Sequence, residues 1–267
     1  MGKEGECPHS LITDEGVKLA LKEKCGEESE LKEWKAVEFL NKGDHHSSHI
    51  SCINVDYTRK EENQKTSFVV KINPLRSSEE SEDMSSMFEK EGGFYSKIIP
   101  ELNKLLQAAN EVDLRFPKCY HTCLEKGKEI IFLEDLRNDD FKTIEKTSCL
   151  DLPRLVLILN ELGRLHASSI LYRKSKSREE LMWQFPFLKE LCASEASINR
   201  PEMKIWAQSI VDGAATILEC VGGYTKAAEE IRKLDIFYRM MTLIEASTLP
   251  FEVFCHGDCW TNNFLFK

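Results

Sequence analysis

The segment Cys255–Lys267 holds a His, an Asp and an Asn at a spacing that suits few kinds of site. Asp258 lies two residues after His256, and Asn263 lies five residues after Asp258. A carboxylate can orient a hydroxyl group and accept its proton, and a neutral amide oxygen can bind a magnesium ion on phosphate groups. One short loop could therefore supply both needs of phosphoryl transfer to a hydroxyl. The same residues equally fit a structural loop, in which Asp258 caps a turn, His256 bonds the backbone and Asn263 precedes a strand.

The charge balance limits the kinds of partner. The net charge is -9 over 267 residues, and the absence of a long basic run argues against a nucleic-acid-binding surface. No apolar run is long enough to span a membrane, and the polar N-terminus lacks the core of a signal peptide. We therefore expect an intracellular, cytoplasmic protein. The sequence carries no signal for an oligomeric state.

The ten cysteines and the clustered histidines show no metal-site spacing. The histidines of residues 45–49 lie in a loop-like segment without further convergent ligands, so we expect them to be solvated. Two cysteine pairs are closely spaced, but neither has a second Cys or His pair at zinc-site spacing, and we interpret them as thiols in a reducing compartment. These pairs are Cys119 with Cys123 and Cys255 with Cys259.

Strands and helices alternate in the first half of the chain. Apolar periodicity predicts a helix over residues 11–40, broken near Gly26. A second helix is expected from Met87 to Asn110, after a polar connection over 77–86. Alternating and β-branched segments predict strands, with a charged hairpin tip at 59–65 between the first two. The predicted strands are 49–55, 66–72, 116–121 and 129–136.

Lys71 is the only cation in the apolar strand at 66–72. It could extend along the edge of a sheet with its charge in water, or it could reach into a nucleotide cleft. The second role needs a carboxylate on a nearby helix. Glu91 lies on the apolar face of the helix that begins near Met87, together with Phe88 and Tyr95, and a Glu on such a face needs a partner. Lys71 is the natural candidate.

The second half of the chain is predominantly helical. The polar residues 137–140 mark a boundary, which predicts an N-terminal part over 1–136 and a helical part over 137–267. The periodicity places His166 on or near a packed face, as a core histidine. Aromatic residues of this half could line a substrate cleft, but core packing is their commoner fate; they are Trp183, Phe185, Phe187 and Trp206. The predicted helices are 152–171, 178–192, 199–220 and 225–246.

Several short motifs in this order resemble those of the ecdysteroid kinase-like proteins, which are relatives of choline kinases and aminoglycoside phosphotransferases. The similarity covers most of the chain from about residue 37, and the His-Gly-Asp-x-Trp-x-x-Asn block is its most specific part. The motifs are Phe68-Val69-Val70-Lys71, Phe88-Glu89-Lys90-Glu91, Phe132-Leu133-Glu134-Asp135-Leu136, Leu165-His166-Ala167-Ser168 and Cys255-His256-Gly257-Asp258-Cys259-Trp260-Thr261-Asn262-Asn263.

The resemblance implies an α+β, two-lobed, protein-kinase-like fold. A small lobe would carry an antiparallel sheet and one helix, and a larger helical lobe would carry the catalytic loop. It also implies ATP and Mg2+, with phosphorylation of a hydroxyl on an ecdysteroid, another steroid-like alcohol or a xenobiotic alcohol. By motif position, Lys71 would contact the α- and β-phosphates and Glu91 would hold Lys71. The backbone from Glu134 to Leu136 would meet the adenine, Asp258 would be the catalytic base, and Asn263 would bind magnesium.

The sequence departs from the family pattern in two places. Ser47 and Ser48 fall in the turn that would cover the phosphates, which reads Gly-Asp-His-His-Ser-Ser here where the family usually has Gly-x-Asn-Tyr-x-Ser. Family members also continue beyond Lys267 to an Asp-Phe-Gln segment, whose Asp is the principal magnesium ligand.

On that resemblance we expect the chain as given to be C-terminally truncated. It would be a weak or inactive kinase, or alternatively a kinase-like binding protein, whereas the longer product would be active. The strand expected at 264–266 would lack its hairpin partner and expose an apolar edge.

Overall fold

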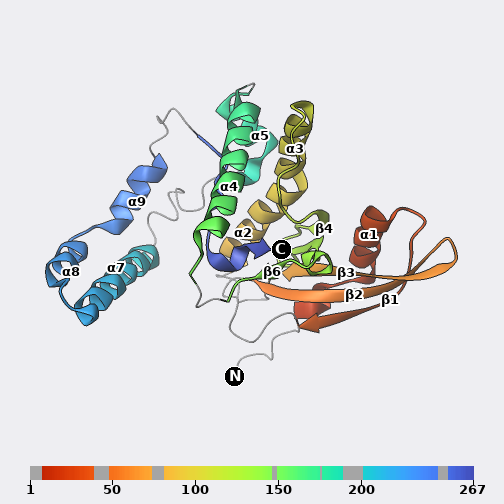
Figure 1. The fold of residues 1–267 in the computed structure, drawn as a ribbon, viewed down its shortest axis with the longest axis horizontal. Helices are drawn as coiled ribbons and strands as arrows, with labels where there is room; N and C mark the ends of the chain where they lie inside the picture. Colours follow the sequence, from red (N-terminus) through yellow and green to blue (C-terminus); the bar gives the residue numbers. More distant parts are fainter. Residues whose placement is uncertain are drawn as a thin grey trace. The chain divides into compact units, whose positions relative to one another are not determined.

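The computed structural model describes residues 8–38, 48–73, 81–145, 149–174, 176–188, 201–245 and 252–267, which form an α+β fold (Figure 1). The chain divides into two compact units. Residues 1–188 with 253–267 form the first unit, and residues 189–252 form the second. The lobe boundary expected at residue 136 stays a prediction.

The first unit is built on a five-stranded antiparallel sheet in the order β1-β2-β3-β5-β4. The strands predicted from the sequence are confirmed, with small shifts at their ends. β2 and β3 join at Lys60 and Glu61, whose φ angles of 51° and 66° suit a two-residue hairpin turn. The strands are β1 (Glu30–Glu38), β2 (His49–Arg59), β3 (Glu62–Ile72), β4 (Cys119–Cys123) and β5 (Ile130–Glu134).

The helix predicted over residues 11–40 is wrong in its second half. α1 spans Asp14–Cys25; the Thr13 side chain caps its first turn, and Gly26 ends it with a φ of 99°. Residues 30–38 instead form β1, which pairs with β2 along its length. Hydrogen bonding to an apolar neighbouring strand therefore outweighs local helix propensity in this segment.

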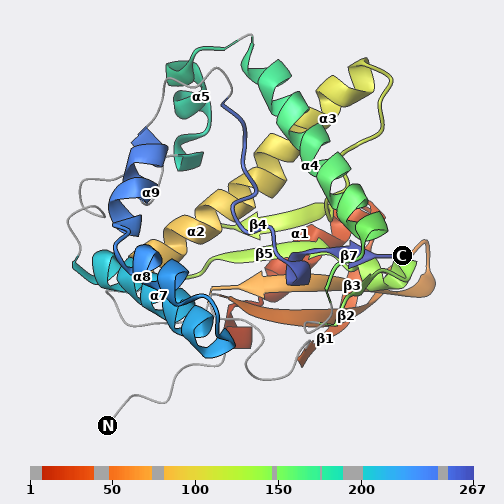
Figure 2. The same ribbon diagram turned by 60° about the vertical axis from the view of Figure 1, so that its left-hand side comes forward.

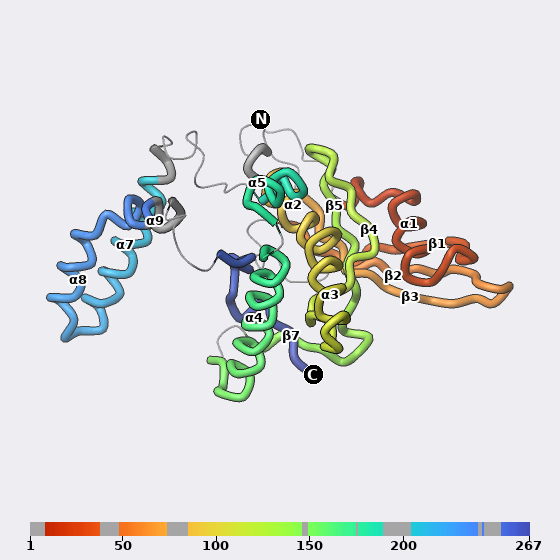
Figure 3. Tube along the Cα trace, turned by 90° about the horizontal axis from the view of Figure 1, so that it is seen from above, coloured from red at the N-terminus to blue at the C-terminus, as the bar shows by residue number. Residues whose placement is uncertain are grey.

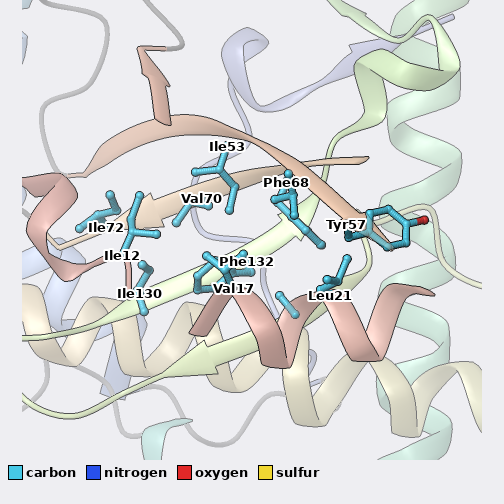
Figure 4. Packing of buried hydrophobic residues seen from close by; sticks show 12 residues of the cluster. Ile12, Val17, Leu21, Ile53, Tyr57, Phe68, Val70, Ile72, Ile130 and Phe132 are labelled. Carbon is cyan, nitrogen blue, oxygen red and sulfur yellow. The ribbon is translucent and has the colours of Figure 1, made fainter. Parts of the chain in front are cut away.

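α1 covers one face of the sheet and encloses the main core of the first unit (Figure 4). Val17 and Leu21 point from α1 towards the sheet, and both are fully buried. Burial of each such side chain contributes about 1.5–3 kcal/mol. The 3-10 helix η1 (Pro8–Leu11) precedes α1 and contacts β3. The strand residues of this core include Ile53, Val55, Phe68, Val70, Ile72, Ile130 and Phe132.

The opposite face of the sheet is covered by a long helical segment, so that the sheet lies between α1 and this segment (Figure 3). α2 (Ser81–Gly93), the π-helical turn η2 (Phe94–Ile98) and α3 (Ile99–Ala108) follow one another without a break (Figure 2). Helix thus begins at Ser81, inside the polar connection predicted over 77–86. The Ile99 N–H bonds to the Phe94 carbonyl, a π-type bond, just before Pro100, which has no N–H to donate.

Gly92 and Gly93 end α2 at a point where other side chains approach its backbone closely. A Cβ at Gly92 would lie 2.7 Å from a methyl carbon of Leu124, and a Cβ at Gly93 would lie 2.6 Å from the ring of Phe187. The two glycines therefore allow a close approach that any larger residue would prevent.

A second core lies among α3, α4 and the segment that follows α4. The Leu165 side chain of α4 is fully buried there. Phe185 and Phe187 belong to this core, whereas the Trp183 side chain is 87% exposed. The elements are α4 (Leu152–Arg173), α5 (Arg178–Gln184) and the 3-10 helix η4 (Pro186–Leu188).

The final strand of the chain has a partner, contrary to expectation. β7 (Leu265–Phe266) pairs antiparallel with the short strand β6 (Lys142–Thr143), and both residues of β7 are half-buried. The Arg154 guanidinium also lies over the Phe266 ring, 5.8 Å from its centroid. The strand expected at 264–266 is thus paired along one edge, by an upstream strand and not by a downstream hairpin partner. No sequence pattern predicts β6, because two residues are too few to show periodicity.

The second unit is helical where it is described, with α7 (Pro201–Val221), α8 (Thr225–Arg232) and α9 (Ile236–Glu245). The single helix predicted over 225–246 is divided between α8 and α9. Trp206 is 51% exposed on α7. Across both units, none of the described helices is long and apolar enough to cross a membrane.

Candidate active site

Lys71 and Glu91 form an ion pair between β3 and α2. Lys71 Nζ lies 2.6 Å from Glu91 Oε1 and 2.7 Å from Oε2. The side chains are 20% and 32% exposed, so the pair is only partly hydrated. The contact predicted from the sequence is confirmed. An ammonium has three N–H donors, and since two face Glu91 the third is left for another acceptor.

Apolar packing surrounds the carboxylate side of this pair. Phe88 of α2 is 2% exposed and packs with strand residues of the sheet. Burial raises the pKa of Tyr95, and the nearby Glu91 carboxylate raises it further. Burial likewise raises the pKa of the Cys119 thiol to about 11, with an added contribution from Glu91. Tyr95 and Cys119 therefore stay neutral at pH 7 and add no charge beside the pair.

The chain leaves β5 through Glu134, Asp135 and Leu136, the segment expected to meet an adenine. The Glu134 N–H donates to the Lys118 carbonyl at 2.8 Å, and the Lys118 N–H donates to Glu134 Oε2 at 3.2 Å. Leu136 begins the 3-10 helix η3 (Leu136–Asp139) and accepts a hydrogen bond from the Phe141 N–H. The backbone of this exit is thus fixed on both sides.

The Asp135 side chain holds the segment that follows β5 in place. This role was not predicted from the sequence. Its carboxyl is 3% exposed and accepts hydrogen bonds from Ser67 Oγ at 2.7 Å and from Arg137 Nε and Nη2, both at 2.8 Å. Asn138 Nδ2 donates to Ser67 Oγ at 3.0 Å and extends the network. A signal was available, because an Asp at the end of an apolar strand needs a partner and an Arg follows two residues later.

The electrostatics of Asp135 follow from these contacts. Burial alone would raise the pKa of its carboxyl, but the Arg137 guanidinium and the Ser67 hydroxyl stabilise the charged form, and the net pKa is lowered. The same pairing raises the pKa of Arg137, against the opposing effect of burial. The network is therefore ionised at neutral pH.

The loop after Glu252 carries the His-x-Asp pattern and is anchored to α4. The Phe254 N–H donates to Ser169 Oγ at 3.3 Å, and the Phe254 ring packs in the second core. Asn263 Nδ2 donates to Asp258 twice, to Oδ2 and to the backbone carbonyl, each at 2.8 Å. Trp260 Nε1 donates to the same Oδ2 at 3.2 Å.

These contacts give Asp258 and Asn263 a defined orientation. Both donors reach Asp258 Oδ2, which leaves Oδ1 without a partner among the described residues. Because Asn263 donates through its nitrogen, its amide oxygen is left to accept or to bind a cation. One carboxylate oxygen and one amide oxygen are thus available on the same short loop.

His256 supports the loop backbone. The Asp258 N–H donates to His256 Nδ1 at 3.3 Å, which requires a neutral imidazole with its proton on Nε2. The centroid of the His256 ring lies 6.3 Å from that of the Phe264 ring. Gly257, between His256 and Asp258 in the sequence, has a φ of 79°. The hydrogen bond between His256 and the backbone is the one expected of a purely structural loop. The Asp258–Asn263 contact fits a structural loop and a catalytic loop equally.

The structure brings some of the expected site residues together but not others. Lys71 contacts Glu91, and Asp258 contacts Asn263. No hydrogen bond or ion pair between the described residues joins these two pairs. Ser48 precedes β2 and is half-buried, whereas Ser47 and the rest of the expected phosphate turn lie outside the described residues.

The donor set can be compared with what a phosphate-bound magnesium ion needs. No group of three or more His, Cys, Asp and Glu side chains in the described ranges could hold a metal ion. Magnesium on phosphates keeps several waters and needs only one or two protein oxygens. The free amide oxygen of Asn263 and the remaining N–H of Lys71 suit a magnesium ion and a phosphate group, respectively, so the residues present fit such a ligand.

The model of the ecdysteroid kinase-like family matches residues 42–267 of the chain. Comparison with curated proteins and with solved structures gives no significant match. The matched region contains the Lys71–Glu91 pair, the Asp135 network and the Asp258–Asn263 loop. This chain therefore belongs to the ecdysteroid kinase-like family.

Proposed function

We propose that this chain is an ATP- and Mg2+-dependent kinase that phosphorylates a hydroxyl of an ecdysteroid or a similar lipophilic alcohol. Membership of the family supports a small-molecule, kinase-like protein. The observation that carries the proposal is the Asp258–Asn263 contact, in which one carboxylate oxygen and one amide oxygen stay available. Phosphoryl transfer to an alcohol needs both kinds of group.

Each site residue then has a distinct part. Asp258 Oδ1 accepts a hydrogen bond from the acceptor hydroxyl and orients it. It takes the hydroxyl proton as the new P–O bond forms, while the bond between the γ-phosphorus of ATP and its β,γ-bridging oxygen breaks and ADP leaves. Lys71, held by Glu91, binds the α- and β-phosphates, and the backbone from Glu134 to Leu136 binds the adenine. Asn263 would hold magnesium, which supplies neutralisation of the charge on the phosphoryl group.

A second candidate function is nucleotide binding without phosphoryl transfer. The small metal donor set among the described residues favours it, because Asn263 is a weak ligand by itself. The two functions make the same prediction for ATP binding and opposite predictions for turnover.

The test measures ATP binding by calorimetry in the presence of magnesium, and ADP release with ecdysone as acceptor. Lys71→Met should weaken ATP binding about 10- to 100-fold, because a hydrogen bond to a charged group contributes about 1.5–3 kcal/mol. Lys65→Met is the matched control, since Lys65 lies on the same strand with an 82% exposed side chain paired to Asp56. Its ATP affinity should stay unchanged.

Asp258→Asn separates binding from chemistry. It should leave ATP affinity within a few-fold and lower turnover by about 10²–10⁴, the usual contribution of a positioned general base. Binding without turnover in the unaltered chain would favour the second function. Absence of ATP binding, or an equal effect of Lys71→Met and Lys65→Met, would contradict both functions.

A further inference from the structure

Three polar atoms converge where η1 meets the start of β2. His9 Nε2 lies 2.7 Å from Ser51 Oγ and 3.2 Å from His49 Nε2. The two imidazole rings meet edge to face, with centroids 5.0 Å apart at 69°. Both rings are half-buried, and Ser51 is fully buried. His9 Nε2 carries either one N–H or one lone pair. It can therefore make a well-directed hydrogen bond to only one of its two neighbours.

We propose that His9 and His49 bind a divalent transition metal ion, with zinc as the representative case, through their Nε2 atoms. Two Zn–N bonds of about 2.0–2.1 Å at a tetrahedral angle place the nitrogens about 3.4 Å apart. The separation here is 3.2 Å, so an ion fits with only a small adjustment of either ring. Neutral imidazole is a preferred ligand of zinc and copper, and water completes the coordination.

The site is separate from the proposed kinase site. Ser51 pairs with Val70 across the sheet, and Val70 lies in the core under α1. Ser51 shares the face of its partner Val70, and His49, two residues away on the same strand, lies on that face too, towards α1. Successive residues of a strand point to opposite faces, so Lys71, next to Val70, faces α2. A bound ion would join η1 to β2, and its consequence is stabilisation of the first unit instead of chemistry on the phosphates.

The affinity should be moderate, because only two protein nitrogens bind the ion. Zinc also binds thiolates, so the exposed cysteines must first be alkylated; these include Cys149, Cys220, Cys255 and Cys259. Calorimetric titration with Zn2+ of the alkylated chain, without an affinity tag, should then give one ion per chain. Either His9→Ala or His49→Ala should weaken binding at least tenfold.

His166→Ala is the control, since His166 is a half-buried imidazole on α4 in the same unit. It should bind zinc as the unaltered chain does. Electron paramagnetic resonance of the unaltered chain with Cu2+ gives a test that needs no substitution, because two bound nitrogens produce a characteristic splitting. Absence of zinc binding, binding that survives either histidine substitution, or a copper spectrum without two nitrogens would overturn the proposal. ATP takes no part in these measurements, so they do not depend on the proposed kinase function.

Discussion

Gly93→Ala is the substitution that best tests how α2 is positioned. Gly93 has helical backbone angles of -65° and -37°, which Ala adopts without strain. An added Cβ would lie 2.6 Å from two ring carbons of Phe187 and 2.8 Å from a third. Optimal carbon contacts are about 3.5–4.0 Å, so the ring would have to retreat by about 1 Å.

The ring of Phe187 has little room to do so. It is 6% exposed and lies 5.8 Å, between ring centroids, from the buried Phe185. Overpacking of this kind costs about 1–3 kcal/mol. Replacement of Gly by Ala inside a helix gains about 0.8–1.0 kcal/mol. Gly93→Ala should therefore lower the free energy of unfolding by about 0–2 kcal/mol.

Gly163→Ala isolates the steric part of this effect. Gly163 lies inside α4, and a Cβ there would meet no atom within 4 Å. This variant should gain the full helix contribution of about 0.8–1.0 kcal/mol. The helix contribution is common to both variants, so the difference between them, about 1–3 kcal/mol, measures the clash with Phe187.

Urea unfolding, followed by circular dichroism and by tryptophan fluorescence, provides the measurement. The two probes must give coincident transitions, because the chain has two compact units. Phe187→Ala supplies a second check, since Gly93→Ala should become stabilising once the ring is removed. If Gly93→Ala stabilises the chain as much as Gly163→Ala does, the close packing of α2 against η4 is refuted.

Two further predictions concern buried ionisable groups. Asp135→Asn should lower the free energy of unfolding by about 1–3 kcal/mol at pH 7, because its hydrogen-bond partners lose a charged acceptor. The folded-state pKa of Asp135 lies below 3.8. The stabilisation by the charged carboxylate is therefore present above pH 3.8 and disappears as the pH falls through the lowered pKa. Urea unfolding at pH 7 and pH 3 checks it, and an equal cost at both would contradict it. At pH 8 Cys119, with its pKa of about 11, should react with iodoacetamide at least tenfold more slowly than the exposed Cys220. Mass spectrometry of each cysteine over time measures both rates, and equal rates would contradict the prediction.

The Lys71–Glu91 contact could be predicted because each residue carried its own local signal. Lys71 is a charge in an apolar strand, and Glu91 is a charge on the apolar face of a helix. A partly buried charge needs an opposite charge nearby, so the two unusual positions point to each other. The structure joins them at 2.6 Å although 20 residues separate them in sequence.

β1 could not be predicted on the same basis. Residues 30–38 have a composition that a helix accepts, and among the side chains described over 30–37 only three are half-buried. What makes them a strand is the adjacent edge of β2, which is not a property of the segment itself. The same reason applies to β6, which exists only because β7 returns to pair with it.

Asp135 is a site residue whose role the sequence motif does not predict. The motif predicts a role for the backbone from Glu134 to Leu136 and assigns none to the side chain of Asp135. In the structure that side chain fixes the exit of β5 to β3 through Ser67 and to η3 through Arg137. A buried carboxylate is a reason to look for its hydrogen-bond partners, whatever role the neighbouring backbone has.

The loop around Asp258 can be held by structural hydrogen bonds and still carry a catalytic group, so the two interpretations of its sequence do not exclude each other. His256 bonds the backbone, as a purely structural loop requires, and Asn263 and Trp260 both reach one oxygen of Asp258. These bonds restrict the rotation of the carboxylate and leave its other oxygen available. A general base must be held in its working orientation before the substrate arrives, because reorientation during the reaction adds to the barrier. The contacts that a structural loop would have are therefore also the ones that the proposed base needs on a surface loop.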